Sequence, residues 1–388
     1  GVRRRAFELL ASGLSMPLLI NDGPTARGFV AAGMLPEDAW EYTVIGCNEL
    51  GVPGRSAESA TSSSGLIQHL ELLNQTLLQH PDPDAIGDMS SLLRALEETM
   101  RRHAFAARER AAANRQRRIA RVPTPFTSAL MRGCIARGRD MQEGMAYHLP
   151  GLYERGLANA ANALAAIEQA VFEERALSLR ALVEAMENDF EDRSVRSRLW
   201  AAPKWGNDDP EVDRWALALV EMRERVLDEV DAAYGHAPHV VCHVVRSLHY
   251  FDGQRIAASP DGRRAWTPVA ESIGASAGTA RRGPTAMLNS VLKLDATRYY
   301  RGGYNLNLTL SRRATTVETL AALVESFLSR GGQELQVNCF DAGTLRAAQR
   351  CPEQHGDLVV RVAGFSARFV DLSAVEQEEL IARAEAVG

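Results

Sequence analysis

A thiol and a carboxylate lie two residues apart in the segment Ile45-Gly46-Cys47-Asn48-Glu49, directly after an apolar stretch. In an extended chain, residues i and i+2 project to the same side, so Cys47 and Glu49 could face one cavity. There they would form a catalytic pair, a reactive thiol beside a proton-accepting carboxylate. A buried structural cysteine remains the more ordinary interpretation of these residues taken alone.

A second unusual segment lies near the C-terminus. In Val360-Arg361-Val362-Ala363-Gly364-Phe365-Ser366-Ala367, two apolar arms meet at a single glycine. Surface hairpins normally carry Asn, Asp or Pro at the turn, and none is present here. The pattern therefore predicts a loop whose tip, at Gly364, enters the protein interior.

Other patterns have ordinary structural explanations. The segment Gly274–Gly278 matches G-x-S-x-G, but the Gly- and Pro-containing sequence after it is a poor helix start for a serine nucleophile. The basic run Arg108–Arg121 could bind phosphate, although such a run is more often a solvated helix face. The acidic run Gly206–Asp209 lacks the ligand order of an EF-hand, and the histidines form no H-E-x-x-H pair. We therefore expect no metal site.

The elements that must position these residues are read from hydrophobic periodicity. Apolar spacing predicts helices at 64–80, 89–121, 157–188, 210–234, 316–330 and 342–349. In the helix predicted over 210–234, Asp209 suits the N-cap and Pro210 suits the first helical position. Strands are expected at 239–245, 304–311 and 334–340. Alternating strands and helices favour an α/β fold with a largely parallel sheet.

Composition excludes several classes of protein. With 388 residues and 46% hydrophobic residues, the chain is large enough to bury a substantial core. Its 44 basic and 49 acidic residues leave a net charge of −5, which does not favour nucleic acid as a partner. The five cysteines are widely spaced without a C-x-x-C pair, which fits a reducing cytoplasm, and no apolar run is long enough to cross a membrane.

Several segments together resemble the glycyl radical enzymes, relatives of pyruvate formate-lyase. The C-terminal stretch from Asn338 to Leu372, with its R-V-x-G-aromatic centre, resembles the family's radical-bearing motif. The other landmarks follow in order along the whole chain: NDGPTARGFVAAGMLPEDAWEYTVIGCNE, PTPFTSALMRGCIARGRDMQEG, PKWGNDDPEVD, ASPDGRRA and GPTAMLNSVLKLD.

The resemblance implies three catalytic residues. Gly364 matches the glycine that stores the radical, Cys47 the cysteine that becomes a thiyl radical, and Glu49 the general base of the G-C-x-E subgroup. Glycine suits the first role because it holds a planar backbone radical without side-chain crowding. The cysteine must stay protonated to give up a hydrogen atom, which a water-poor pocket favours. Trp205, His249 and Tyr304 are candidates for the walls of a substrate pocket.

Three differences between this sequence and the family's motifs reduce the number of reaction types that we expect. Cys47 stands alone between Gly46 and Asn48, whereas pyruvate formate-lyase uses two adjacent cysteines. The region after it, GRSAESATSSSG, lacks the His-Asp pair of the diol dehydratases. Phe365 replaces the usual Tyr, a mild change. The resemblance then implies an anaerobic, cytoplasmic lyase that cleaves a C–C bond by decarboxylation, or a C–heteroatom bond, of a small molecule. The alternatives are a small-polyol dehydratase, or a non-catalytic or split-subunit relative serving as a binding or assembly module.

The family's usual chain is about twice as long, and the part before the cysteine is absent here. We therefore expect about half of the ten-stranded glycyl radical enzyme barrel, surrounded by helices. Residues 1–340 would form the barrel portion with the cysteine loop, and residues 341–388 the glycine radical domain. No bound cofactor is expected, since a radical S-adenosylmethionine (SAM) activase would install the glycyl radical. Further expected partners are a companion N-terminal half or a second copy of the chain.

Overall fold

The computed structural model describes residues 1–388 except 46–48, 58–60, 62, 236, 244–247 and 386–388. Its helices are α1 (Val2–Ala11), α2 (Asp22–Ala31), α3 (Pro36–Ala39), α4 (His69–Leu78), α5 (Met89–Arg121), α6 (Pro125–Ala129), α7 (Cys134–Arg137), α8 (Met141–Gly144), α9 (Leu157–Ile167), α10 (Leu179–Glu187), α11 (Arg193–Ala201), α12 (Pro210–Tyr234), α13 (Leu248–Arg255), α14 (Gly283–Leu292), α15 (Ala296–Tyr299), α16 (Val317–Ser329), α17 (Ala342–Arg350) and α18 (Ala374–Glu385). A π-helical segment, Glu168–Glu173, extends α9.

The strands form a curved parallel sheet and two hairpins. They are β1 (Leu19–Ile20), β2 (Thr43–Ile45), β3 (Glu49–Gly51), β4 (Gly65–Gln68), β5 (Gly151–Arg155), β6 (Val240–His243), β7 (Leu306–Leu310), β8 (Glu334–Cys339), β9 (Val359–Arg361) and β10 (Ser366–Arg368). Strands β4, β5 and β6 pair in parallel, as do β7 and β8. A parallel bridge between His243 and Tyr304 joins the two sets, and β1 pairs antiparallel with β8. The expected parallel sheet is confirmed.

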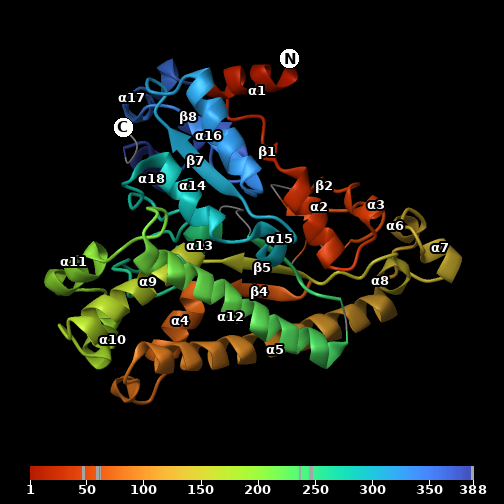
Figure 1. The fold of residues 1–388 in the computed structure, drawn as a ribbon, viewed down its shortest axis with the longest axis horizontal. Helices are drawn as coiled ribbons and strands as arrows, with labels where there is room; N and C mark the ends of the chain where they lie inside the picture. Colours follow the sequence, from red (N-terminus) through yellow and green to blue (C-terminus); the bar gives the residue numbers. More distant parts are fainter. Residues whose placement is uncertain (46–48, 58–60, 62, 236, 244–247, 386–388) are drawn as a thin grey trace.

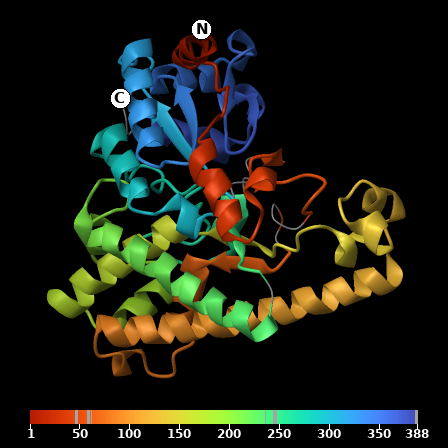
Figure 2. The same cartoon turned by 45° about the vertical axis from the view of Figure 1, so that its right-hand side comes forward.

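Helices cover the sheet in layers (Figures 1 and 2). Helices α4, α5, α9 and α12 pack against one another beside β4 and β5, and α16 packs against α1 near β8. The N- and C-terminal segments lie at the same end of the molecule as β7 and β8. No helix among the described residues is long and apolar enough to cross a membrane.

The two faces of β5 have different partners, and this orients the site. Tyr153 packs with Leu66 and Cys242 on one face. On the other face, the buried Glu154 contacts His69, Arg223 and His243. Burial and the charge of Arg223 lower the pKa of His243 to about 3, so its imidazole is neutral.

Four of the six predicted helices begin and end close to the predicted residues, namely α5, α12, α16 and α17, and the other two differ. Asp209 caps α12 by accepting a hydrogen bond from the Glu211 N–H. The helix expected over 64–80 begins only at His69, because residues 65–68 form β4 beside β5. The helix expected over 157–188 is interrupted between Glu173 and Leu179. The G-x-S-x-G segment lies in bends and turns, with no strand-to-helix elbow.

Candidate functional site

The glycine segment near the C-terminus forms a tight antiparallel hairpin. Strands β9 and β10 pair with Arg361 opposite Ser366, and the Val362 N–H donates to the Phe365 carbonyl over 3.0 Å. Val362, Ala363 and Gly364 are buried, while Phe365 is 39% exposed. The expectation of a loop tip inside the protein is confirmed.

Strand β8 holds this hairpin in place through polar side chains. Asn338 donates from Nδ2 to the Arg361 carbonyl over 2.9 Å, and the Arg361 N–H donates to Asn338 Oδ1 over 3.0 Å. The Arg361 guanidinium also donates to the buried Gln336. These bonds satisfy groups that would otherwise be unpaired in the interior, so they fix the hairpin against the sheet.

The C-terminal helix α18 also contacts this hairpin, through an arginine that is held by ion pairs. Arg383 donates to the Val362 carbonyl over 3.2 Å and forms ion pairs with Glu379 and Glu271. Glu379 also lies 2.9 Å from His249 Nε2. Although burial favours the neutral acid, the charges of Arg383 and His249 hold the pKa of Glu379 below its usual value. The hairpin is thus tied to the C-terminal helix as well as to the sheet.

The cysteine segment is described only on its two sides. Gly46, Cys47 and Asn48 lie outside the described residues. The flanking strands β2 and β3 pair antiparallel, with Ile45 opposite Glu49. Glu49 is 1% exposed, and its Oε1 accepts a hydrogen bond from the Tyr153 hydroxyl over 3.1 Å. The predicted general base is therefore buried against the Tyr153 face of β5.

The sequence analysis missed Glu334, the first residue of β8. Its side chain is fully buried, and neither carboxyl oxygen has a hydrogen-bond partner in the described part of the chain. Burial and the negative charge of Glu49 raise its pKa well above the usual value, while the charge of Arg361 acts in the opposite sense. Glu334 thus interacts both with Glu49, two residues after Cys47, and with Arg361, three residues before Gly364. A carboxyl group inside the strand expected over 334–340 was the available signal.

The three candidate wall residues are all buried, and each has a partner within the chain. Trp205 donates its indole N–H to the Ile273 carbonyl over 2.7 Å and packs in the main hydrophobic core. His249 binds Glu379, as described above. Tyr304 accepts a hydrogen bond from the Gln333 N–H over 3.0 Å, and its ring packs edge-on against Tyr300. Their contact with a substrate stays a prediction.

No group of three or more His, Cys, Asp or Glu residues is placed to hold a metal ion in the ranges that the structure describes. What the site does contain is a buried backbone hairpin, two buried carboxyl groups and a tyrosine hydroxyl. Such an arrangement can hold a proton in a water-poor environment, which suits chemistry that must exclude solvent.

The buried Glu334 should make stability depend on pH. In the unfolded chain its carboxyl ionises near pH 4, whereas in the fold it stays protonated to higher pH. The unfolded chain then binds fewer protons, so the free energy of unfolding falls as the pH rises through this window. We expect Glu334→Gln to remove at least about 1 kcal/mol of that fall between about pH 5 and about pH 8.

Urea unfolding at about pH 5 and at about pH 8 gives the free energy of unfolding of each protein at each pH. Only the difference between the two pH values is compared between proteins. Any cost of burying the glutamine amide is the same at both pH values, so it cancels in this difference. Glu37→Gln, at an exposed position of α3, is the control and should leave the pH dependence unchanged. Identical pH dependence for Glu334→Gln and the unaltered protein would mean that Glu334 is ionised in the fold.

Comparison with known proteins places this site in a family. The family description "Pyruvate formate lyase-like" matches residues 1–251, and "Glycine radical" matches residues 269–370. The chain is 31% identical over 411 residues to the probable dehydratase YbiW of Escherichia coli, covering 97% of this chain and 50% of that protein. It is 30% identical over 414 residues to isethionate sulfite-lyase of Oleidesulfovibrio alaskensis, covering 97% of this chain and 48% of that protein.

A solved structure gives the same result for the fold. The glycerol-bound, B12-independent glycerol dehydratase of Clostridium butyricum superposes with a TM-score of 0.88 at 28% identity, covering 98% of this chain and 50% of that one. The expected fold, about half of the glycyl radical enzyme barrel with surrounding helices, is confirmed. The chain spans about half the length of the curated relatives it matches. With its family matches, its glycine hairpin and its fold, this chain belongs to the pyruvate formate lyase-like family of glycyl radical enzymes.

Proposed function

We propose that the protein is the radical-bearing part of a glycyl radical lyase. Gly364 stores the radical, Cys47 carries it to the substrate as a thiyl radical, and Glu49 acts as the general base. The observation that supports the proposal is strand β8, whose Asn338 is hydrogen-bonded to Arg361 beside the glycine, and whose buried Glu334 feels the charges of both Glu49 and Arg361. This favours a single site for the two radical positions.

The proposed reaction sequence conserves its hydrogen atoms. The Gly364 radical takes a hydrogen atom from the Cys47 thiol, and the thiyl radical takes one from a substrate carbon. The substrate radical then loses its leaving group while Glu49 accepts a proton. The product radical recovers the hydrogen atom from Cys47, and the resulting thiyl radical takes a hydrogen atom back from Gly364, which restores the glycyl radical. Buried hairpin residues and buried Glu49 support the exclusion of water that these intermediates require.

For the substrate we propose a small molecule that loses a carboxyl group or a heteroatom substituent. The named relatives include a sulfite-lyase and dehydratases, so both kinds of elimination occur on this fold. A polyol dehydratase is the second candidate, favoured by the superposition on glycerol dehydratase. The absence of a His-Asp pair between Gly54 and Gly65 disfavours it.

We also propose a division of the chain at about residue 340. A separate apolar cluster supports it, formed only by residues from 340 onward: Phe340, Leu345, Ala348, Val360, Val362, Phe369, Leu380, Ile381 and Ala384. In this proposal, residues 341–388 form the glycine radical domain, and residues 1–340 form the barrel portion. Movement of the domain would give a radical SAM activase access to Gly364.

The remaining barrel strands would come from a partner. Strand β4 ends the sheet among the described residues, and a groove of about 650 Å³ runs along it, lined in part by Leu66, Gln68 and His103. Helix α5 covers part of this edge, because His103 Nε2 lies 2.7 Å from the Leu66 carbonyl oxygen, and the groove leaves room for a further element, since a sheet edge is normally paired or covered. We therefore propose that the active protein contains a companion N-terminal half, or a second copy of this chain, at that edge.

Native mass spectrometry of the protein purified anaerobically from its source tests this prediction. We expect a complex whose mass exceeds the 42.4 kDa of the chain. A single chain of that mass that forms the radical and turns over without any partner would contradict the companion proposal. That result would not affect the assignment of Gly364, because the mass of the complex tests the companion and the EPR signal tests the radical glycine.

The proposed function itself is tested by activation. The protein, with its companion if one is found, is incubated anaerobically with a cognate radical SAM activase, S-adenosylmethionine and a reductant. We expect an organic-radical EPR doublet, since the unpaired electron at a glycyl Cα couples to its one remaining hydrogen. A silent spectrum under conditions that activate a related enzyme would count against the proposal.

A further inference from the structure

A cavity of about 490 Å³ lies against the first turns of the C-terminal helix α18. Its other walls come from α9, from α11 with the segment that follows it, and from residues 261–279, and each of these segments is described without a gap. Helices α9, α11 and α18 lie on the same side of the molecule (Figure 1). None of the residues assigned to the radical reaction is among the described lining residues. The volume is within the range of pockets that bind small organic molecules.

The surface that faces the cavity is mainly apolar, because most of its polar lining residues present carbon atoms to it. Trp200, Val269 and Val375 contribute apolar side chains from three different segments. Removing an apolar group from water into such a space is favourable. A ligand of this cavity should therefore have an apolar body.

One buried amide group in the wall lacks a partner. Asn162, on α9, is 1% exposed, and its Oδ1 accepts a hydrogen bond from the Trp205 N–H over 2.7 Å. Since a backbone N–H only donates, this bond fixes which end of the amide is the oxygen. The remaining Nδ2 has no hydrogen-bond partner among the described residues. Asn159, one turn earlier, differs because Asp261 and the Ala270 N–H engage both ends of its amide. The unused donor of Asn162 indicates a ligand with an acceptor atom.

Two further donors line the same cavity. Lys204 directly precedes Trp205, donates from Nζ to the Leu199 carbonyl over 2.8 Å, and forms no ion pair within the described part of the chain. Burial lowers the pKa of Lys204 to about 8, although the charge of Asp261 acts in the opposite sense. At neutral pH the ammonium group is mainly protonated and has further hydrogen atoms to donate. Ser276 Oγ is shielded from solvent and has no hydrogen-bond partner in the described ranges.

The other charged residues of the described wall already have partners within the chain. They are Arg196 with the Gly262 carbonyl, Arg263 with the carbonyls of Ile256 and Thr267, Arg264 with Asp189, Asp261 with Asn159, Glu378 with Arg346, and Glu379 with Arg383. Each of the three carboxylates is thus engaged by another side chain. Lys204 is left to bind an anion from solution.

We propose that this cavity binds a small organic acid, whose carboxylate accepts hydrogen bonds from Asn162, Lys204 and Ser276 and whose apolar body fills the rest of the space. A carboxylate offers acceptor oxygens to several donors, and its single charge matches one ammonium group. The segments that carry the donors are tied together, because Asn207 Nδ2 donates to the carbonyls of Lys204 and Thr279 over 2.8 and 2.9 Å. The bound acid would also contact α18, and so touch both parts of the chain in the proposed division.

Titration with octanoate tests the site, with the protein and its companion, if one is found, studied by calorimetry. Asn162→Asp is the sharpest variant, because it keeps the oxygen that the Trp205 N–H requires and replaces the amide donor with an acceptor. We expect Asn162→Asp and Lys204→Gln to weaken octanoate binding about tenfold or more, and Ser276→Ala about threefold or more. The affinity of the unaltered protein should also fall above about pH 8, because Lys204 then loses its proton.

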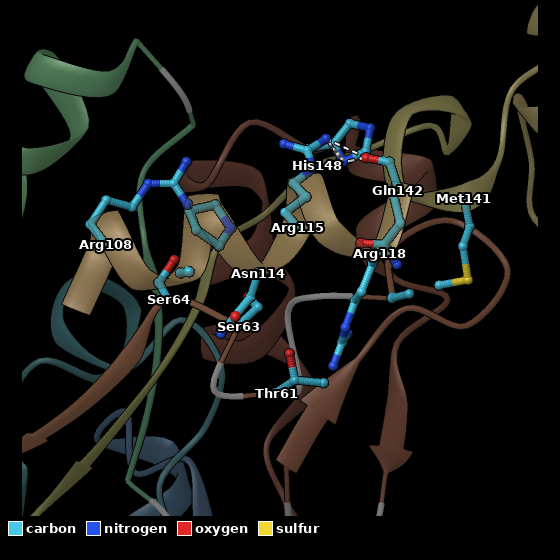
Figure 3. Close-up of a pocket in the computed structure, with 13 residues that line it drawn as sticks. Thr61, Ser63, Ser64, Arg108, Asn114, Arg115, Arg118, Met141, Gln142 and His148 are labelled. Carbon is cyan, nitrogen blue, oxygen red and sulfur yellow. Dashed lines mark hydrogen bonds between the residues drawn. The ribbon is translucent and has the colours of Figure 1, made fainter. Parts of the chain in front are cut away.

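Two controls separate this site from general attraction. Arg118 is exposed on α5, where it lines a different cavity and extends toward Thr61 (Figure 3). Arg118→Gln removes one positive charge, as Lys204→Gln does, and should change octanoate binding less than about twofold. Octanol has the same apolar body without the charge and should bind about tenfold more weakly or worse.

Hydrogen exchange locates the bound acid, since octanoate should slow amide exchange in residues 261–279 and 374–379. Octanol binding as tightly as octanoate would show that the cavity takes up any apolar molecule, and it would overturn the proposal. Equal losses for Arg118→Gln and Lys204→Gln would do the same, as would the absence of saturable binding or unchanged binding by a folded Asn162→Asp protein. The test needs no radical and no turnover, so its result is independent of the proposed function.

Discussion

Replacing Gly364 with alanine abolishes the EPR doublet that activation produces in the unaltered protein. Only glycine places a backbone radical between an amide nitrogen and a carbonyl without a side chain on the radical carbon. The added methyl group would also enter a buried hairpin tip, where Val362 and Ala363 are already almost inaccessible to solvent. Both effects act in the same direction, so we expect no radical signal at residue 364.

Gly356→Ala is the matched control for this experiment. Gly356 lies eight residues earlier in the same C-terminal region, and a Cβ placed on it would meet no atom within 4 Å. Its variant should form the doublet as the unaltered protein does. Circular dichroism of both variants shows whether the fold is retained. A folded Gly364→Ala protein that still gives the doublet would place the radical on another residue and would end the assignment.

The helices that the sequence predicts well are those whose ends are determined locally. Helix α12 begins at an Asp-Pro pair and ends at Gly235, and α5 begins after Asp88, whose side chain caps it. Residues 65–68 were predicted as helix because their apolar spacing suits either structure. They form a strand since residues 152–155, far away in the sequence, pair with them. Pairing between distant segments overrides local preference, and one sequence does not reveal it.

A similar division applies to the candidate site. Cys47, Glu49 and Gly364 stand in recognisable motifs, so their types and spacing were enough to select them. Glu334 belongs to no motif. Its interest comes from burial without a hydrogen-bond partner among the described residues, which depends on how distant segments pack. The basic stretch shows the same limit, because the sequence does not tell which of its arginines line a cavity and which face water.

Replacing Cys47 with serine separates storage of the radical from its use. Activation acts on Gly364, so we expect Cys47→Ser to retain the glycyl EPR doublet. Turnover should fall by about a thousandfold or more, because the O–H bond of serine is too strong to give its hydrogen atom to a glycyl radical. Cys351→Ser, at a partly exposed free cysteine, is the control and should retain both signal and activity.

Deuterium oxide gives this experiment a second readout that does not need the substrate. A thiol exchanges its hydrogen with solvent, so repeated transfer between Cys47 and Gly364 would place deuterium on the glycine Cα. The doublet would then collapse toward a single line in the unaltered protein and in Cys351→Ser, but would persist in Cys47→Ser. Collapse in Cys47→Ser would mean that another group reaches Gly364. In that case the thiyl role would have to be reassigned, even though the radical glycine would stand.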